Sequence, residues 1–225
     1  LGLRYPLMVK PAFDDASGGI DAGSVVRDRA ALEARVALVV GEHKMPALVE
    51  EFIDGREIHC AILGDRPLPL YEMQFKSGNV DNEGRPLPGI ITYRAKWDAY
   101  SRDYYAMESK CPVDDLAPEV VERIQAIAQR AYHTLGCRDY ARVDMRVDRA
   151  TNQPYILEVN PNPELADGCA FAQCVRVSGR SYEQAIQAIV GFALDRAADR
   201  PKREPAPSET LLREYIAQRG RTSAR

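Results

Sequence analysis

The sequence predicts an α+β protein in which paired strands and amphipathic helices follow one another. Three observations predict this class. Apolar runs at 46–52 and 57–63 flank the short turn "IDGR", and the segments 139–148 and 154–160 alternate polar with apolar residues. Between Pro118 and Gly136, apolar residues recur every three to four positions. The first two patterns are typical of strand pairs, and the third is typical of a helix with one buried face.

Composition limits the class of function. The 225 residues suffice for one medium domain or two small ones. A formal charge of −3 gives no general attraction to nucleic acid or to an anionic membrane. No apolar run approaches the roughly 20 residues that span a bilayer. The five cysteines are scattered and form no CxxC, so we expect a reduced, cytoplasmic protein.

The remaining elements follow from local signals. Asp28 caps a predicted helix over 29–41, and Ser181 with Gln184 forms a capping box for a helix over 182–197. Further strands are expected at 7–13, 24–28, 67–75 and 89–96. After Arg200 the chain becomes Pro-rich and then charged, with one short amphipathic helix expected around 211–216. We interpret this segment as a tail outside the core.

One face of the hairpin over 139–160 carries acidic and amide side chains. With a loop over 149–153, antiparallel pairing places Asp144 opposite Glu158 and Arg142 opposite Asn160. Opposed Cβ atoms in such pairs lie about 5 Å apart. Facing carboxylates repel one another, and a hard divalent cation held by oxygen ligands relieves that repulsion. Arg142 would lie beside the metal, where it can stabilise developing negative charge.

A purely structural interpretation of this face remains open. The same alternation adds Arg146 and Asp148 to it, and polar faces are common on edge hairpins. Arg142 by itself neutralises Asp144. The spacing therefore does not decide between a metal site and a solvated hairpin.

Five motifs occur in order along the chain: "VKP" with a Gly/Ser loop, "LVEEFIDGREI", "YRAKW", "CRDYARVDMRVD" and "YILEVNPNP". Over roughly residues 5–197 this series resembles the ATP-grasp superfamily, most closely its D-alanine–D-alanine ligase-like branch of carboxylate–amine ligases. The resemblance implies the ATP-grasp fold, in which two α+β subdomains clasp ATP. We expect a small lid subdomain over 1–53, a large subdomain over 54–198 and a tail over 199–225.

The family's N-terminal domain has no counterpart in this chain. The chain begins at Leu1 rather than at a methionine. We therefore expect that an N-terminal part is lacking. In the family that part contributes to the carboxylate site, so we expect this piece to bind nucleotide and to turn over poorly by itself.

The resemblance assigns phosphate contacts to three places. Lys10 and Lys96 match lysines that reach the nucleotide phosphates. The loop 14–20, which includes Ser17, matches the lid whose backbone N–H groups cover those phosphates. Without the family context, a solvated lysine and an ordinary turn explain these residues equally well.

The resemblance also assigns the nucleoside contacts. Glu50 matches the residue that accepts from the adenine amino group, and the backbone from Glu51 to Ile53 would read the adenine edge. Glu57 matches the carboxylate that holds the ribose hydroxyls. A carboxylate suits an amine or a diol because it accepts hydrogen bonds and donates none.

Asp144, Glu158 and Asn160 match the family's metal ligands, and Arg142 matches its catalytic arginine. The implied cofactors are ATP and Mg²⁺, with Mn²⁺ as a substitute. The implied reaction is an ADP-forming ligation in which a carboxylate takes the γ-phosphoryl group and an amine then attacks the acylphosphate. Amino acids or peptides are the expected substrates, with no nucleic acid or membrane partner; a homodimer is left open.

Two other functions remain as alternatives: a nucleotide-binding module without turnover, and an ATP-grasp kinase that stops after phosphoryl transfer. Two departures from the branch also bear on function. Glu164 in "PNPELADGCAF" stands where the branch has glycine, which favours an amine acceptor other than D-alanine. In the lid, Asp14, Asp15 and Ala16 replace Glu, Gly and Ser.

The histidines and the tryptophan receive structural interpretations. No pair among His43, His59 and His133 has the spacing of metal ligands, so we expect them to be structural or exposed. Trp97 is expected to serve packing.

Overall fold

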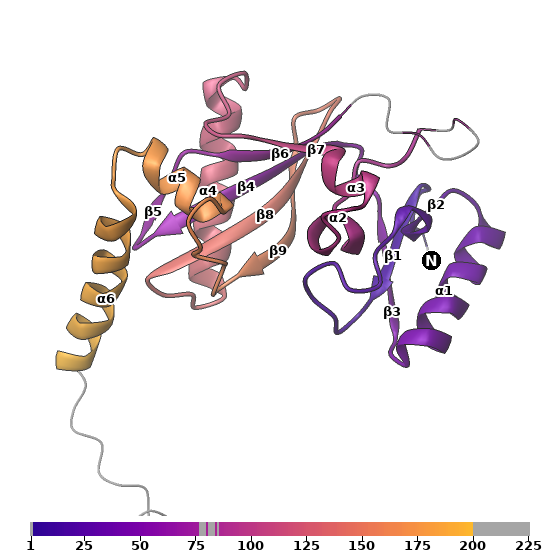
Figure 1. Ribbon diagram of the computed structural model, residues 1–225, viewed down its shortest axis with the longest axis horizontal. Helices are drawn as coiled ribbons and strands as arrows, with labels where there is room; N and C mark the ends of the chain where they lie inside the picture. The colour runs from indigo at the N-terminus through magenta and orange to yellow at the C-terminus, as the bar shows by residue number, and fades with distance from the viewer. Residues whose placement is uncertain (1, 77–79, 81–83, 85, 200–225) are drawn as a thin grey trace, which may run out of the picture.

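The computed structural model describes residues 2–199 except 77–79, 81–83 and 85. It contains a small and a large antiparallel sheet, with short helices beside the small sheet (Figure 1). Of the predicted tail, only Asp199 is among the described residues, and the helix expected around 211–216 lies outside them.

The small sheet has the strand order β2-β1-β3 and is covered on one face by the helix α1. Asp28 caps this helix as predicted, since its Oδ1 accepts from the Ala31 N–H at 2.9 Å. Leu7 and Val9 pack towards α1, so Met8 and Lys10 lie on the opposite face. Figure 1 shows α1 on the side of the small sheet that is turned away from the large sheet. The elements are β1 (Leu7–Pro11), the 3₁₀ helix η1 (Ala22–Ser24), β2 (Val25–Val26), α1 (Arg29–His43) and β3 (Ala47–Glu51).

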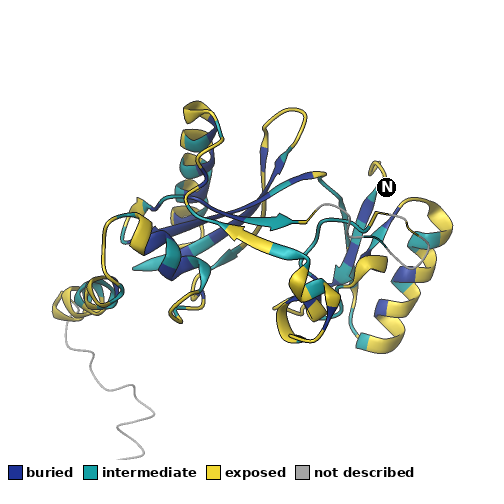
Figure 2. Cartoon of the chain, turned by 45° about the horizontal axis from the view of Figure 1, so that its top comes forward, coloured by how far each residue is buried: buried dark blue, intermediate teal, exposed yellow. Residues whose placement is uncertain are grey.

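The large sheet has the strand order β7-β6-β4-β8-β9, with β5 paired to β4 at the side of this path. The longest pairing joins β4 to β8, from Gly55 opposite Asp148 to Leu63 opposite Tyr140. Strand β9 is therefore an edge strand, and its middle residues are exposed (Figure 2). The strands are β4 (Gly55–Leu63), β5 (Arg66–Pro67), β6 (Tyr71–Phe75), β7 (Met107–Lys110), β8 (Tyr140–Asp148) and β9 (Pro154–Asn160).

The two faces of the large sheet are covered differently. Helix α4 (Pro118–Thr134) buries one face through Ile124 and Ala128, against Ile58, Val143 and their neighbours. Helix α5 (Ala170–Val177) covers only part of the other face, around Ala61 and Tyr71. The rest of that second face carries polar side chains, and the candidate site lies there. Helix α6 (Tyr182–Ala198) follows, with the predicted Ser181–Gln184 capping box.

The prediction of a strand over 89–96 is wrong, because residues 89–92 belong to no strand and a helix follows them. Residues Tyr93–Trp97 form the short helix α2, and Arg102–Tyr105 form a second short helix, α3. The Thr92 hydroxyl caps α2 by accepting from the Ala95 N–H at 3.1 Å, and donates to Asp103 at 2.9 Å. Thr, Tyr and Trp favour strands by propensity, but a capping threonine overrides that preference here.

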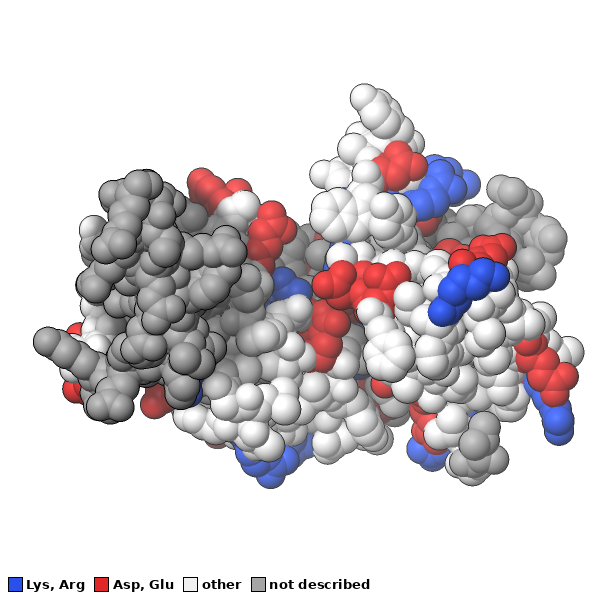
Figure 3. All heavy atoms as spheres, turned by 90° about the horizontal axis from the view of Figure 1, so that it is seen from below, with Lys and Arg blue, Asp and Glu red and all other residues white. Residues whose placement is uncertain are grey.

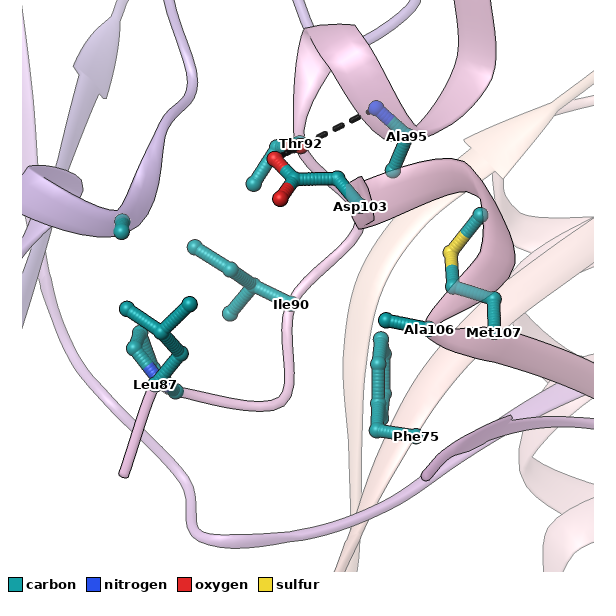
Figure 4. A pocket seen from close by; sticks show the side chains of 10 residues that line it. Phe75, Leu87, Ile90, Thr92, Ala95, Asp103, Ala106 and Met107 are labelled. Atoms are coloured by element: carbon teal, nitrogen blue, oxygen red, sulfur yellow. Dashed lines mark hydrogen bonds between the residues drawn. The ribbon is translucent and has the colours of Figure 1, made fainter. Parts of the chain in front are cut away.

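These helices border a small cavity of about 30 Å³, roughly the space of one water molecule. Figure 4 shows Phe75, Ile90 and Met107 around it, with the capping bond from Thr92 to Ala95 at its rim. The cavity is too small for a substrate, so we assign it to packing.

Gly55 allows β4 and β8 to pair closely beside the candidate site. A Cβ at this position would lie 2.0 Å from the Val147 carbonyl oxygen. We expect Gly55→Ala to lower the free energy of unfolding by about 1–3 kcal/mol, because backbone must move. Gly41→Ala is the matched control. A Cβ at this helical position meets nothing within 4 Å, so helix propensity predicts a gain of about 1 kcal/mol. Urea unfolding of both variants checks the pair, and equal effects would contradict the close approach.

Among the described residues, no helix is both long and apolar enough to cross a membrane.

Candidate active site

The β8–β9 hairpin brings the four predicted metal-site residues together. Asp144 lies opposite Glu158 and Arg142 opposite Asn160, as predicted, whereas residues 145–147 pair one position earlier on β9 than the predicted register. All four side chains share the partly uncovered face of the large sheet. The hairpin therefore presents two carboxylates, a carboxamide and a guanidinium at one place.

A β-bulge is responsible for this register. On the loop side Met145 pairs with Ile156, so uninterrupted pairing would place Leu157 opposite Asp144. The pairing shifts between Asp144 and Met145, which leaves Leu157 as the extra residue and moves Glu158 into place. A bulge inserts one residue into one strand and re-aims the side chains beyond it. The predicted loop over 149–153 gave these two pairs correctly because the bulge offsets the one-residue error in the pairing on the loop side.

Hydrogen bonds connect the four residues. Arg142 donates to both oxygens of Asp144, from Nε and Nη2, each at 2.7 Å. The Asn160 Nδ2 group donates to Asp144 Oδ2 and to Glu158 Oε1, both at 3.1 Å. The carboxamide thus joins the two carboxylates. In this state Arg142 is bound to Asp144, as the purely structural interpretation expected.

Asp144 is nearly fully buried, and Glu158 is exposed. Burial by itself raises the pKa of Asp144, but the neighbouring His59 and Arg142 outweigh it and hold that pKa below its ordinary value. The carboxylate is therefore ionised at neutral pH and available as an oxygen ligand.

These residues fit a hard divalent cation. Two carboxylates and one carboxamide converge, and Mg²⁺ needs only a few protein oxygens when phosphates supply others. Within the described ranges no group of three or more His, Cys, Asp and Glu side chains is arranged to hold a metal. The candidate site therefore depends on Asn160 as its third ligand. Binding would require the Asn160 carbonyl oxygen to turn inward, and Arg142 to leave Asp144.

Glu57 of β4 lies opposite Arg146, two residues along β8 from Asp144. A buried ion pair with Arg146 holds the Glu57 side chain. Arg146 Nη1 donates to Glu57 Oε2 at 3.1 Å, and Arg146 Nε donates to the Ile53 carbonyl at 3.1 Å. The guanidinium also lies over the rings of Phe52 and Phe75, at 5.2 and 5.9 Å from their centroids. Burial lowers the pKa of Arg146, although Glu57 opposes the shift. The Ile53 carbonyl, predicted to face adenine, is thus engaged by Arg146.

The predicted nucleotide residues of the small sheet lie on both of its faces. Lys10 Nζ pairs with Glu50 Oε2 at 2.5 Å, on the face turned away from α1. A predicted phosphate contact and a predicted adenine contact therefore touch one another. Glu51 points to the other face and pairs with Arg4 at 3.0 Å. This geometry is compatible only with the backbone role proposed for Glu51.

Side chains from outside the lid loop hold its backbone at two points, Ala16 and Gly19. Ser17, at its centre, has a positive φ of 65°. The Trp97 Nε1–H donates to the Ala16 carbonyl at 3.1 Å, so the expectation that Trp97 serves packing is wrong: its side chain is mostly exposed and holds the lid. Arg35 donates to the Gly19 carbonyl at 2.8 Å from the other side. The predicted phosphate lysine Lys96 precedes Trp97 on α2 and is exposed.

The Trp97 contact predicts a specific effect on the lid. We expect Trp97→Phe to speed hydrogen exchange of the backbone amides of residues 14–20 by about 3- to 10-fold, since one hydrogen bond of about 1 kcal/mol is lost. Tyr100→Phe is the control, because Tyr100 is almost fully exposed on the same segment. Hydrogen exchange followed by mass spectrometry checks both variants. Unchanged lid exchange in Trp97→Phe would show that the bond does not restrain the loop.

A cavity of about 930 Å³ borders this site. It is lined by Arg146 together with Asp54, Phe75 and Arg149, and neither Asp144 nor Lys10 is among its lining residues. In the view from below, acidic side chains gather near the middle of the face (Figure 3). Such a concentration of negative charge attracts cations rather than anions.

Two residues of the site were not assigned a role from sequence. Arg146 was placed on the acidic face by alternation but received no partner. His59 alternates with Glu57 on β4 and lies directly opposite Asp144. The alternation of β4 was the available signal for His59, because it puts Glu57 and His59 on one face.

Comparison with known proteins shows the family of the chain. Residues 2–191 match the family model described as "D-ala D-ala ligase C-terminus". The chain belongs to this ligase family. The predicted ATP-grasp fold and the branch that the motifs resembled are thereby confirmed.

Individual relatives give the extent of the similarity. A D-alanine–D-alanine ligase of Desulforudis audaxviator is 34% identical over 202 residues, which cover 86% of this chain and 57% of that protein. The uncharacterized protein y4sG of Sinorhizobium fredii is 34% identical over 192 residues, which cover 85% of this chain and 53% of that protein. The chain thus spans about half the length of the curated relatives it matches.

Solved structures show the same fold. The D-alanine–D-alanine ligase of Bacillus anthracis complexed with ATP has a TM-score of 0.63 at 24% identity, covering 87% of this chain and 54% of that one. The VanG D-Ala:D-Ser ligase of Enterococcus faecalis has a TM-score of 0.65 at 28% identity, covering 85% of this chain and 50% of that one.

Proposed function

We propose that this chain is the ATP-binding part of an ADP-forming carboxylate–amine ligase whose amine acceptor differs from D-alanine. The observation that carries the proposal is the convergence of Arg142, Asp144, Glu158 and Asn160 on the open half of the large sheet, inside a ligase-family fold. A relative of this fold has been solved with ATP, which supports a nucleotide as the ligand.

In the proposed arrangement the small sheet, with residues 1–53, closes over ATP held by the subdomain of residues 54–198. Lys10 and Lys96 neutralise the phosphates, and the backbone N–H groups around Ser17 cover them. Glu50 accepts from the adenine amino group, and the backbone from Glu51 to Ile53 reads the adenine edge. The protein contributes orientation and fixed charge rather than a covalent group.

At the reacting end, Asp144, Glu158 and Asn160 hold Mg²⁺, or Mn²⁺ in its place. When bound, the cation supplies neutralisation of the charged phosphates. Arg142 then leaves Asp144 and stabilises the negative charge that develops as the substrate carboxylate attacks the γ-phosphorus, the bond to the β–γ bridging oxygen breaks and ADP leaves. The same guanidinium faces the acylphosphate when the amine attacks the acyl carbon and phosphate leaves.

The acceptor is proposed to differ because of the segment after Asn160. Glu164 is exposed there, and an exposed carboxylate favours an acceptor that carries positive charge. The similarity to a D-Ala:D-Ser ligase supports variation of the acceptor within this fold.

The test uses the only tryptophan of the chain, Trp97, which touches the lid. We expect Mg·ATP to change its fluorescence in the complete gene product, and we expect phosphate release only when an amino acid or peptide carboxylate and an amine are both present. A stable phosphorylated product from one substrate would indicate a kinase instead. Nucleotide binding without turnover across such a screen would indicate a binding module, and absence of nucleotide binding would reject the proposal.

A further inference from the structure

His59 is a buried histidine with no hydrogen bond. Its side chain is 7% exposed, and neither ring nitrogen has a hydrogen-bond partner among the described residues. At least one ring nitrogen carries a proton at any pH, and leaving a buried donor unsatisfied is costly. An orphaned donor in a candidate site suggests a contact that forms only when a ligand is bound.

The position of His59 shows which contact is available. It lies on β4 between Tyr71 of β6 and Asp144 of β8, in one row across the sheet. Its ring stacks on Tyr71, with centroids 5.5 Å apart and planes 15° apart, which restricts the ring's orientation. Its Nε2 atom is 3.7 Å from Glu57 Oε1, just beyond hydrogen-bond distance.

Glu57 is the natural acceptor. Arg146 already occupies its other oxygen, Oε2, at 3.1 Å. No described residue donates a hydrogen bond to the Oε1 atom, and His59 Nε2 lies 3.7 Å from it. Contacts in unliganded sites are often long and tighten when the ligand binds.

We propose that His59 is a positioning residue for nucleotide binding: its Nε2–H donates to Glu57 Oε1 in the nucleotide complex and fixes the carboxylate against the ribose hydroxyls. This inference rests on the proposed function, because it takes Glu57 as the ribose-binding group. Arg146 and His59 would then hold one carboxylate oxygen each, as supporting groups orient the ligands of other sites.

The experiment compares ADP with 2′,3′-dideoxy-ADP, without metal and with a chelator, by titration calorimetry. Without the metal, the metal-mediated contribution of Asp144 and Glu158 to the nucleotide affinity is absent. We expect His59→Phe, which keeps the stack on Tyr71, to weaken ADP binding about tenfold. Dideoxy-ADP should bind the variant and the wild type within about twofold, because it has no hydroxyls for Glu57 to accept from. His59→Gln, which keeps an N–H donor, should restore most of the ADP affinity.

His133→Phe is the matched control. His133 is also near a carboxylate, with Nε2 3.8 Å from Asp65 Oδ1, but the pair lies exposed on the surface and away from the site. Its substitution should leave both affinities unchanged.

A second measurement uses the wild-type protein and needs no folded variant. The chain has three histidines, so ¹⁵N imidazole signals can be resolved and assigned. ADP should shift the Nε2 signal of His59 towards that of a hydrogen-bonded donor, and dideoxy-ADP should not.

The outcomes separate the two proposals. Equal weakening of both nucleotides by His59→Phe, or no weakening, overturns the role of His59 and leaves ATP binding standing. Wild-type protein that binds ADP and dideoxy-ADP equally overturns the ribose role of Glu57 and this inference with it. Wild-type protein that binds neither nucleotide overturns the proposed function as well.

Discussion

Glu158→Gln is expected to weaken Mg·ATP binding by more than about 100-fold while leaving the fold intact. The side chain is exposed, so its loss costs little stability, but it removes one of two carboxylates that would face the cation. Two titrations with ATP, followed by Trp97 fluorescence, measure the effect: one at fixed Mg²⁺ and one without metal, in the presence of a chelator. The metal-free affinity should change little.

Glu119→Gln is the control for this experiment. Glu119 is an exposed carboxylate in the first turn of α4, on the opposite face of the large sheet. It should retain wild-type affinity for Mg·ATP. If Glu158→Gln also retained it, Glu158 would not be a metal ligand, and the hairpin would be the solvated structural feature that its polar face alone allows.

Asp144 is less suitable for such a test. It is buried and bound to Arg142, so Asp144→Ala would leave a largely buried guanidinium without its partner. Loss of Asp144 would therefore affect the stability of the fold as well as metal binding, whereas loss of Glu158 would affect mainly metal binding.

Arg146→Met is expected to lower the free energy of unfolding by about 3–5 kcal/mol, because it leaves the Glu57 carboxylate buried without its strongest partner. Both side chains are at most 10% exposed. Methionine has a similar volume and retains contact with Phe52 and Phe75, so lost packing contributes little. Urea unfolding measures the change.

The double variant Arg146→Met with Glu57→Gln isolates the ion pair. Neutralising Glu57 removes the unpaired charge, so the double variant should be more stable than Arg146→Met by about 1–3 kcal/mol. A single-variant loss below about 1 kcal/mol, or a double variant that is less stable than the single one, would contradict a buried pair at this position.

Much of the fold followed from local patterns because those patterns have local causes. The helix after Asp28 and the helix after Ser181 begin where their capping residues lie. Strand alternation placed Arg142 with Asp144 on one face of β8, and Glu158 with Asn160 on one face of β9. In each of these places the neighbouring residues determine the structure.

Other features depend on contacts between distant residues. The bulge at Leu157 reflects how β9 fits against β8, and alternation of β9 alone gives no sign of it. The helix at Tyr93–Trp97 replaces a predicted strand, and it is held partly by the lid, since the Tyr93 N–H donates to the Ile20 carbonyl at 3.0 Å. The Arg146–Glu57 pair joins two strands that are 89 residues apart in sequence. Patterns within one element cannot specify such partners.

The most direct test of this account is a crystal structure with Mn²⁺ and a non-hydrolysable ATP analogue, in which anomalous scattering locates the cation. We predict one anomalous peak within about 2.5 Å of carboxylate oxygens of Asp144 and Glu158 and of the Asn160 carbonyl oxygen, with Arg142 displaced from Asp144. A cation bound elsewhere, with Arg142 still paired to Asp144 beside a bound nucleotide, would contradict it.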